Sequence, residues 1–205
     1  MAEPEHPQLY LVTPPDFELS RFLPLAAAVM DAAPVACFRL ALATRDEDRI
    51  ALAADALRAL AHERDIPIVI DDHVGLVERL GLDGVHLTDG ARNVRAARKA
   101  LGPDAIVGAF CGASRHNGMS AGEAGADYVA FGPVSGALGS EELAEQDLFA
   151  WWSEMIELPI VAEGGLDLDA QTRLAPVADF LTFGEEIWSA DDPATELAAR
   201  FAALS

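Results

Sequence analysis

Lysine is almost missing from this chain of 205 residues, because Lys99 is the only one. It lies in a stretch with helical periodicity, 91–101, and not at the end of a predicted strand. Basic residues as a group are few: 14 lysines and arginines stand against 34 aspartates and glutamates, which gives a formal net charge of -20. The sequence therefore nearly excludes catalytic or phosphate-binding lysine chemistry, and we expect no binding to nucleic acid or to an anionic membrane.

Cysteine and long apolar runs are scarce as well. Cys37 and Cys111 are too few for a disulfide framework or a zinc site of the usual spacing, and we expect both in the core of a protein from a reducing compartment. The N-terminal segment MAEPEHPQLY has no basic region followed by an apolar one, and no apolar run approaches the roughly 18 residues of a membrane span. The sequence predicts a soluble, cytoplasmic protein.

What the chain does contain is a regular alternation of short β-type runs and longer helical patterns. With 51% hydrophobic residues it is long enough for one well-buried core and short for two, so we expect a single domain over residues 1–205. The predicted strands are Gln8–Thr13, Val35–Leu42, Pro67–Asp71, Gly84–Leu87, Ile106–Phe110, Tyr128–Phe131, Ile160–Ala162 and Phe180–Thr182. The predicted helices are Leu19–Asp31, Asp46–Arg64, Gly75–Leu80, Ala91–Leu101, Met119–Ala124, Glu142–Ile156, Leu168–Leu174 and Pro193–Leu204.

Eight such units predict an α/β fold, a single-domain (β/α)8 TIM barrel with few insertions. Strands that are apolar throughout, such as IPIVI and YVAF, are typical of a parallel sheet covered on both faces. LGLD before Gly84 and AGAD before Tyr128 repeat one device, in which glycine ends a helix and aspartate leads into the next strand. The alternative is an open doubly wound sheet, but no glycine-rich fingerprint follows the first strand.

In a barrel of this kind, function lies at the carboxyl ends of the strands. Two adjacent strands end near carboxylates, Asp72 and Asp89. Hard oxygen ligands grouped in this way suit Mg²⁺, which commonly takes one or two carboxylates and completes its shell with water and substrate phosphate. Spacing alone favours another interpretation, in which Asp71 and Asp72 cap the following helix and Asp89 belongs to a turn.

The segment LPIVAEGGL is a candidate phosphate loop, because Gly164 and Gly165 follow a strand directly. Gly132, after the strand YVAF, is a second candidate for backbone contacts to an anion. Carboxylates accompany both the candidate loop and the end of the last strand, namely Glu163 and the pair Glu185 and Glu186. We expect His86 to be a neutral core histidine, and His73 and His116 to be surface residues in loops. At least one of Trp151 and Trp152 should be in the core or an interface.

At these residues the chain resembles the thiamine phosphate synthase family and its barrel relatives, which include a thiazole tautomerase. The likeness covers roughly Val35–Pro193 and rests on IPIVIDDHVGLVERLGLDGVHL, AGADYVAFGPV and LPIVAEGGL. It implies the coupling of a hydroxymethylpyrimidine diphosphate to a thiazole phosphate, with release of pyrophosphate and with Mg²⁺ as cofactor. By the same resemblance Asp72 stands at the family's magnesium-binding aspartate, Arg39 at its second-strand arginine, and Gly164 and Gly165 at its thiazole-phosphate loop.

The chain departs from the family pattern at polar positions. The glutamine and lysine of the second-strand motif appear as Cys37 and Ala41, the second metal aspartate would fall near Ala91 with Asp89 as a displaced substitute, and the final Val-Ser region reads Gly184-Glu185-Glu186. After Val134 the family's Thr-Pro-Thr-Lys loop is replaced by Ser135-Gly136-Ala137-Leu138.

Three hypotheses stay open at this point. The first is the synthase, and the second is a non-catalytic or regulatory small-molecule-binding paralogue with an acidic barrel mouth. The third is a tautomerase-like isomerase, for which only His116 is a plausible base. A homo-oligomer is also open.

Overall fold

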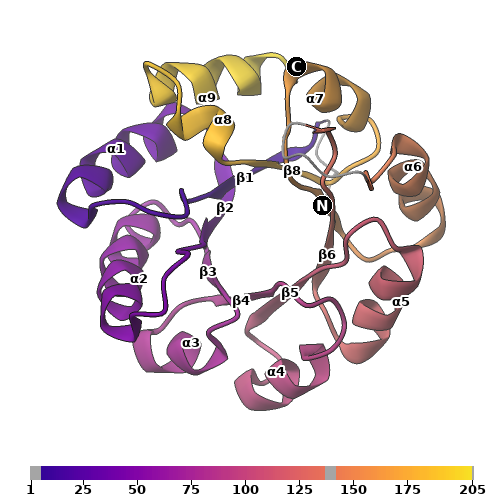
Figure 1. Ribbon diagram of the computed structural model, residues 1–205, viewed down its shortest axis with the longest axis horizontal. Helices are drawn as coiled ribbons and strands as arrows, with labels where there is room; N and C mark the ends of the chain where they lie inside the picture. The colour runs from indigo at the N-terminus through magenta and orange to yellow at the C-terminus, as the bar shows by residue number, and fades with distance from the viewer. Residues whose placement is uncertain (1–5, 137–141, 205) are drawn as a thin grey trace.

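A closed barrel of parallel strands forms the centre of the computed structural model, which describes residues 6–136 and 142–204 (Figure 1). Each strand pairs with its neighbours in the chain, and β1 closes the ring by pairing Gln8 with Phe180 of β8. The strands are β1 (Gln8–Val12), β2 (Val35–Leu40), β3 (Ile68–Asp71), β4 (Gly84–Leu87), β5 (Ile106–Phe110), β6 (Tyr128–Phe131), β7 (Ile160–Ala162) and β8 (Phe180–Phe183). The predicted (β/α)8 TIM barrel is confirmed.

Helices surround the barrel on its outside (Figure 1). They are α1 (Leu19–Ala32), α2 (Glu47–His62), α3 (Val74–Leu80), α4 (Val94–Leu101), α5 (Arg115–Ala124), α6 (Gln146–Met155), α7 (Leu168–Leu174), α8 (Glu185–Trp188) and α9 (Pro193–Ala202). Helix α5 begins four residues before its predicted start, because the Ser114 side chain caps it by accepting from the Asn117 amide at 3.2 Å. The single turn α8 was not predicted.

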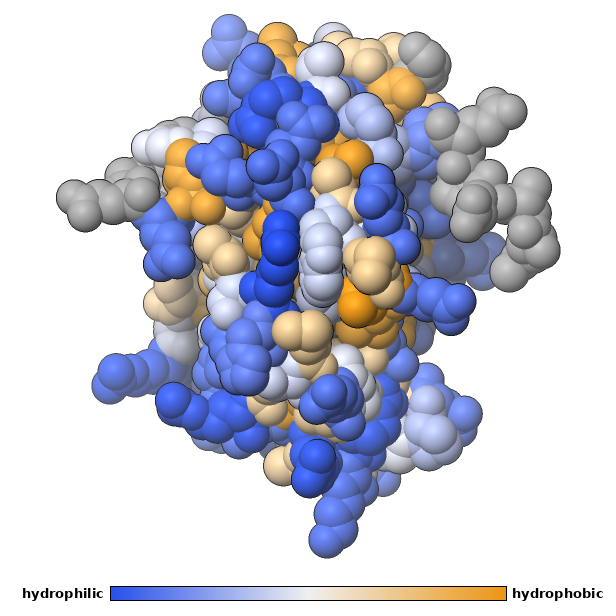
Figure 2. Space-filling model, turned by 90° about the vertical axis from the view of Figure 1, so that its right-hand side faces the viewer, coloured by the Kyte–Doolittle hydropathy of each residue, from blue (hydrophilic) through white to orange (hydrophobic). Residues whose placement is uncertain are grey.

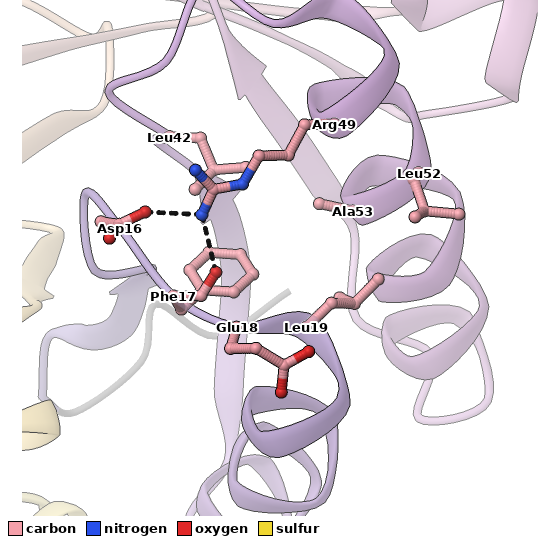
Figure 3. A pocket seen from close by; sticks show the side chains of 8 residues that line it. All are labelled: Asp16, Phe17, Glu18, Leu19, Leu42, Arg49, Leu52 and Ala53. Atoms are coloured by element: carbon pink, nitrogen blue, oxygen red, sulfur yellow. Dashed lines mark hydrogen bonds and ion pairs between the residues drawn. The ribbon is translucent and has the colours of Figure 1, made fainter.

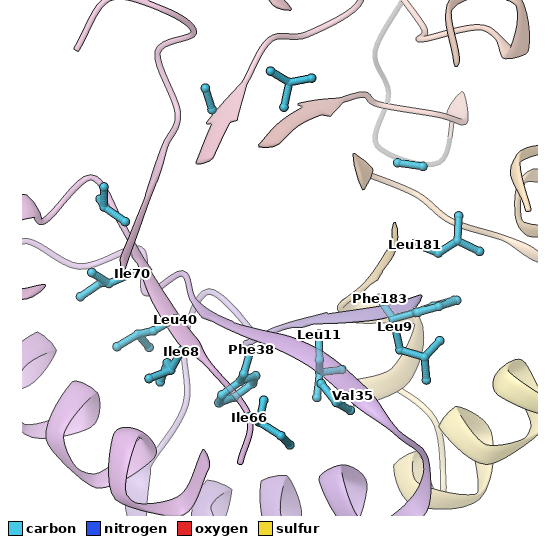
Figure 4. Close-up of a cluster of buried hydrophobic side chains, with 14 of the residues drawn as sticks. Leu9, Leu11, Val35, Phe38, Leu40, Ile66, Ile68, Ile70, Leu181 and Phe183 are labelled. Atoms are coloured by element: carbon cyan, nitrogen blue, oxygen red, sulfur yellow. The ribbon is translucent and has the colours of Figure 1, made fainter. Parts of the chain in front are cut away.

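Side chains along each strand alternate between two cores. Outward-facing residues such as Leu9, Leu11, Phe38 and Leu40 pack between the strands and the helices, as Figure 4 shows for one side of the barrel. Inward-facing residues fill the interior of the barrel: Tyr10, Cys37, Val69, Tyr128, Ala130 and Val161. Both predicted core cysteines are buried and free, and Trp152 is buried as expected.

The repeated glycine-aspartate device has a clear structural role. Gly81 and Gly125 end their helices in the left-handed conformation. The aspartates that follow accept the backbone N–H near the start of the preceding strand: Asp83 from Ile68 at 2.8 Å, and Asp127 from Val107 at 2.7 Å. Asp179, before β8, does the same for Ile160 at 2.8 Å. The device therefore ties together the amino ends of neighbouring strands.

The surface carries the excess of acidic residues found in the sequence. On the face shown in Figure 2, hydrophilic side chains predominate and the apolar ones form small, separated patches. Within residues 6–136 and 142–204, none of the helices is long and apolar enough to cross a membrane. Ala137 and Leu138, two of the residues at which the sequence departs from the family loop, lie outside the described residues.

Candidate functional site

A buried ion pair crosses the carboxyl end of the barrel. Arg39 of β2 donates from Nη1 to Oε2 of Glu163 at 2.9 Å and from Nη2 to Oε1 at 2.5 Å. Only 6% of the Arg39 side chain and 17% of the Glu163 side chain are exposed. The pKa of Glu163 is lowered, because Arg39 outweighs the opposing effect of burial. Glu163 therefore points into the barrel mouth and neutralises the arginine there.

Gly132 is what allows Glu163 to take this position. A Cβ atom at residue 132 would lie 1.9 Å from the Glu163 carbonyl oxygen, so only glycine fits at this close approach. The Glu163 amide also donates to the Phe131 carbonyl at 3.0 Å. The glycine predicted as an anion contact thus serves here to seat the end of β7.

Asp71 joins the ion pair from the end of β3. Its Oδ1 lies 3.4 Å from Nε of Arg39, and a quarter of its side chain is exposed. Burial raises the pKa of Asp71 to about 7, because its effect, together with the negative charge of Glu163, exceeds the opposing effect of Arg39. The alternative in which Asp71 and Asp72 cap helix α3 was wrong, since the capping residue is His73 and makes no side-chain capping bond.

A line of neutral hydrogen-bonding groups runs below the ion pair. Tyr10 and Tyr128 share a hydroxyl–hydroxyl bond of 2.7 Å, and the Tyr128 hydroxyl lies 2.8 Å from Nδ1 of His86. Burial, with a further contribution from Arg39, lowers the pKa of His86 to about 3, so the ring is neutral at pH 7. His86 is the predicted core histidine, and its Nε2 lies 3.8 Å from Oε2 of Glu163.

Within the described part of the chain, three buried polar atoms at the ion pair make only these longer contacts and no hydrogen bond: Nε of Arg39, Oδ1 of Asp71 and Nε2 of His86. Each belongs to an inward-facing residue at or near the mouth of the barrel. Such groups are costly to bury unless water or a ligand reaches them. Each of the three atoms could therefore form a hydrogen bond with water or with a ligand in the mouth of the barrel.

The two predicted metal ligands lie at the rim between β3 and β4. Asp72 has a left-handed backbone with φ 54°, and its carboxylate accepts from the Thr88 amide at 2.9 Å and the Thr88 hydroxyl at 2.5 Å. Asp89 accepts from the Asn93 side chain at 2.7 Å. All four residues line one open cavity of about 410 Å³. Among the described residues no group of three histidines, cysteines or carboxylates is placed to hold a metal.

The candidate phosphate loop has the backbone form its glycines predict. Gly164 and Gly165 both have positive φ, 86° and 73°, a conformation that other residues rarely adopt. The next amide, of Leu166, donates to Oε1 of Glu186 at 2.8 Å, while the Gly184 amide after β8 donates to Oε2 at 2.9 Å. A carboxylate of the protein is therefore bound between the loops after β7 and β8.

A further cavity of about 410 Å³ lies outside the barrel, between the start of α1 and the first turns of α2 (Figure 3). Arg49 closes one side of it by donating to the Asp16 carboxylate at 2.5 Å and to the Phe17 carbonyl at 2.8 Å. None of the predicted site residues lines this cavity.

The histidine considered as a base, His116, is exposed on helix α5, so its predicted loop position was wrong.

Reasoning from the sequence missed four contributors to the site: Tyr10, Asp71 as a partner of Arg39, Thr88 and Tyr128. The sequence did contain a signal for the pairing of Arg39 with Asp71 and with Glu163. Arg39, Asp71 and Glu163 each lie two residues after an inward-facing apolar residue, namely Cys37, Val69 and Val161. Period two along three strands thus places these charges on the same inner face.

Comparison with known proteins gives a consistent result. The model of the family described as thiamine monophosphate synthase matches residues 9–179. The chain is 41% identical to a protein of Rhodospirillum centenum named thiamine-phosphate synthase, over 89% of each chain. It is 38% identical to one of the same name from Erythrobacter litoralis, over 95% of this chain and 94% of that protein. The solved structure of a thiamine phosphate pyrophosphorylase from Pyrococcus furiosus has a TM-score of 0.84 at 20% identity, covering 96% of this chain and 95% of that one, which shows a shared fold.

Proposed function

This chain belongs to the thiamine monophosphate synthase family, and on that basis we propose that it joins a hydroxymethylpyrimidine diphosphate to a thiazole phosphate. The bond between the pyrimidine methylene carbon and the diphosphate oxygen breaks, and pyrophosphate leaves with the electron pair. The thiazole nitrogen then donates its lone pair to the methylene carbon and forms the new C–N bond. The observation that carries the proposal is 41% identity to a named synthase over 89% of both chains.

Asp72, with Asp89 as a second ligand, would hold Mg²⁺ at the rim between β3 and β4. The donor set fits the ion, because Asp72 and Asp89 are exposed carboxylates that share a cavity with the oxygens of Thr88 and Asn93, and Mg²⁺ needs few protein ligands beside its waters. When bound, the ion would neutralise charge on the diphosphate.

The protein's own residues would orient the two substrates. Gly164 and Gly165 shape the loop after β7, where backbone amides can contact the thiazole phosphate. Arg39 faces the same mouth from β2, and a diphosphate that reached it would compete with Glu163 for the guanidinium. The two buried, free cysteines support a reducing, cytoplasmic location.

A second candidate is a ligand-binding protein without synthase activity. The observation that favours it is the Arg39–Glu163 pair, because Glu163 removes the positive charge that Arg39 would otherwise offer to a diphosphate. In this second candidate function, the chain would bind an uncharged or cationic heterocycle, and not a diphosphate, in the mouth of the barrel.

Activity can be tested by incubating the purified protein with both substrates and Mg²⁺ and measuring thiamine phosphate and pyrophosphate together. We expect both products in equal amounts, with a loss of at least about 100-fold in rate for Asp72→Ala. Asp104→Ala is the matched control, because Asp104 is exposed just before β5, at the opposite end of the barrel. If no thiamine phosphate forms at high enzyme concentration, the synthase proposal fails and the binding protein remains.

A further inference from the structure

The Glu186 carboxylate occupies a place where a phosphate would be expected. In barrels of this type the loops after strands seven and eight often bind phosphate through backbone amides. Here the Leu166 amide after β7 and the Gly184 amide after β8 each donate to a different oxygen of Glu186, at 2.8 and 2.9 Å. The two carboxylate oxygens are thus held by one amide from each of the two loops.

Helix capping alone does not explain this arrangement. The bond from the Gly184 amide is local, two residues away, and resembles a capping contact at the start of α8. The bond from Leu166 comes from a loop 20 residues earlier in the chain. The side chain therefore links two loops, and the link is made at the amide that directly follows Gly164 and Gly165.

Helix α8 fixes Glu186 in this position. The neighbouring Ile187 is fully buried. Trp188 donates from Nε1 to the Val12 carbonyl at 2.6 Å and packs edge-on against Phe22, with ring centroids 4.9 Å apart. With the helix anchored on both of these residues, the carboxylate can leave the amides only by a change in its own side-chain torsions.

We propose that Glu186 is a specificity-determining residue that competes with the substrate phosphate for the Leu166 and Gly184 amides. The inference rests on the proposed function for the identity of the phosphate, but the competition itself concerns any phosphate at these amides. A double-negative phosphate cannot share the two donors with a carboxylate, because both ligands are negative and each amide N–H has one hydrogen to give. The protein therefore binds phosphate weakly until Glu186 moves or is removed.

Binding of inorganic phosphate, measured by isothermal titration calorimetry, tests the proposal without any catalytic step. We expect Glu186→Ala to lower the dissociation constant at least about tenfold, and Glu186→Gln to lower it by a smaller factor, since one repelling charge at contact distance is removed. Glu185→Gln is the matched control: Glu185 is the exposed neighbour on the same helix, and the charge change is the same. It should alter the constant less than about twofold.

The proposal is overturned if a folded Glu186→Ala protein binds phosphate no more tightly than the wild type, or if Glu185→Gln has an equal effect. Thermal unfolding establishes that the variants fold, and should the alanine variant fail to fold, the isosteric glutamine variant decides by the same criterion. These experiments also distinguish failure of this proposal from failure of the proposed synthase activity. A protein that makes no thiamine phosphate, yet gains phosphate affinity in Glu186→Ala, loses its proposed reaction and keeps this competition. If instead the enzyme is active and its Glu186→Ala variant keeps the wild-type phosphate affinity, the synthase proposal stands and the competition by Glu186 is excluded.

Discussion

At the scale of single residues, Glu163 contributes to stability through its buried ion pair with Arg39. Its carboxylate is the main partner of a guanidinium that is almost fully buried. Replacing one member of such a pair leaves an uncompensated charge, so we expect Glu163→Gln to lower the free energy of unfolding by about 3 kcal/mol. Urea denaturation measures the change, with Glu157→Gln as the matched control because Glu157 is exposed.

The double variant R39M/E163L separates charge from packing. It removes both charges at once, so we expect it to be more stable than Glu163→Gln alone. A Glu163→Gln protein within about 0.5 kcal/mol of the wild type would contradict the assignment of a buried, paired charge.

Asp71 makes stability depend on pH. Its pKa is about 7 in the folded protein and 3.8 in the reference state, so between these values the folded state binds more protons than the unfolded state. The contribution of Asp71 to stability is therefore greatest when the carboxyl is protonated and falls as pH rises from about 4 to 7. We expect Asp71→Asn to lack this fall and to exceed the wild type by about 2 kcal/mol at pH 8, a value already reduced for the partial exposure of the side chain.

Denaturation curves of the wild type and Asp71→Asn at pH 5, 6, 7 and 8 test this expectation, because other titrating groups cancel in the difference. Asp104→Asn serves as the control for the change in net charge. The expectation fails if the difference between the wild type and Asp71→Asn stays constant over the whole range.

At the scale of elements, the repeated aspartate before alternate strands gives a test of how the barrel is held together. The Asp179 carboxylate accepts from the amide of Ile160, which is fully buried, at 2.8 Å. Asp179→Ala leaves that N–H without an acceptor, and we expect a loss of about 1 to 2 kcal/mol in the free energy of unfolding. Asp179→Asn keeps an acceptor oxygen and should lose less. Equal losses in the two variants, read from urea curves, would exclude the hydrogen bond as the cause.

Strands and long helices were predictable because each depends on its own sequence. The apolar runs of β4 to β7 predicted those strands to the residue, and the periodicity of the other elements gave their bounds to within a few residues. Helix α8 was not predicted, because a single helical turn is too short to show a periodic pattern. For the candidate site, the sequence predicted which residues lie at the carboxyl ends of the strands, but not which of them contact each other. The contact between Arg39 and Glu163 joins residues 124 apart in the chain. Period two places both side chains on the inner face of their strands, but only the closed barrel brings β2 and β7 close enough for the contact.

For the whole molecule, the net charge of -20 sets the response to salt. Ion pairs on the surface, such as Arg49 with Asp16, contribute about 0 to 1 kcal/mol each and weaken when salt is added. Repulsion among the excess carboxylates acts over longer distances, since the screening length is about 30 Å at roughly 0.01 M salt and about 10 Å at 0.1 M. The repulsion should dominate, because carboxylates outnumber the cations that could pair with them by 20.

We therefore expect the temperature of unfolding at pH 7 to rise as NaCl increases from about 10 mM to 300 mM, the range over which repulsion becomes screened. Differential scanning calorimetry measures the rise, and a series with tetramethylammonium chloride separates screening from specific binding of sodium. If repulsion is the cause, the two salts act alike at equal ionic strength. A midpoint that falls with added salt would mean that the surface ion pairs, and not the excess of negative charge, govern the electrostatic stability of this barrel.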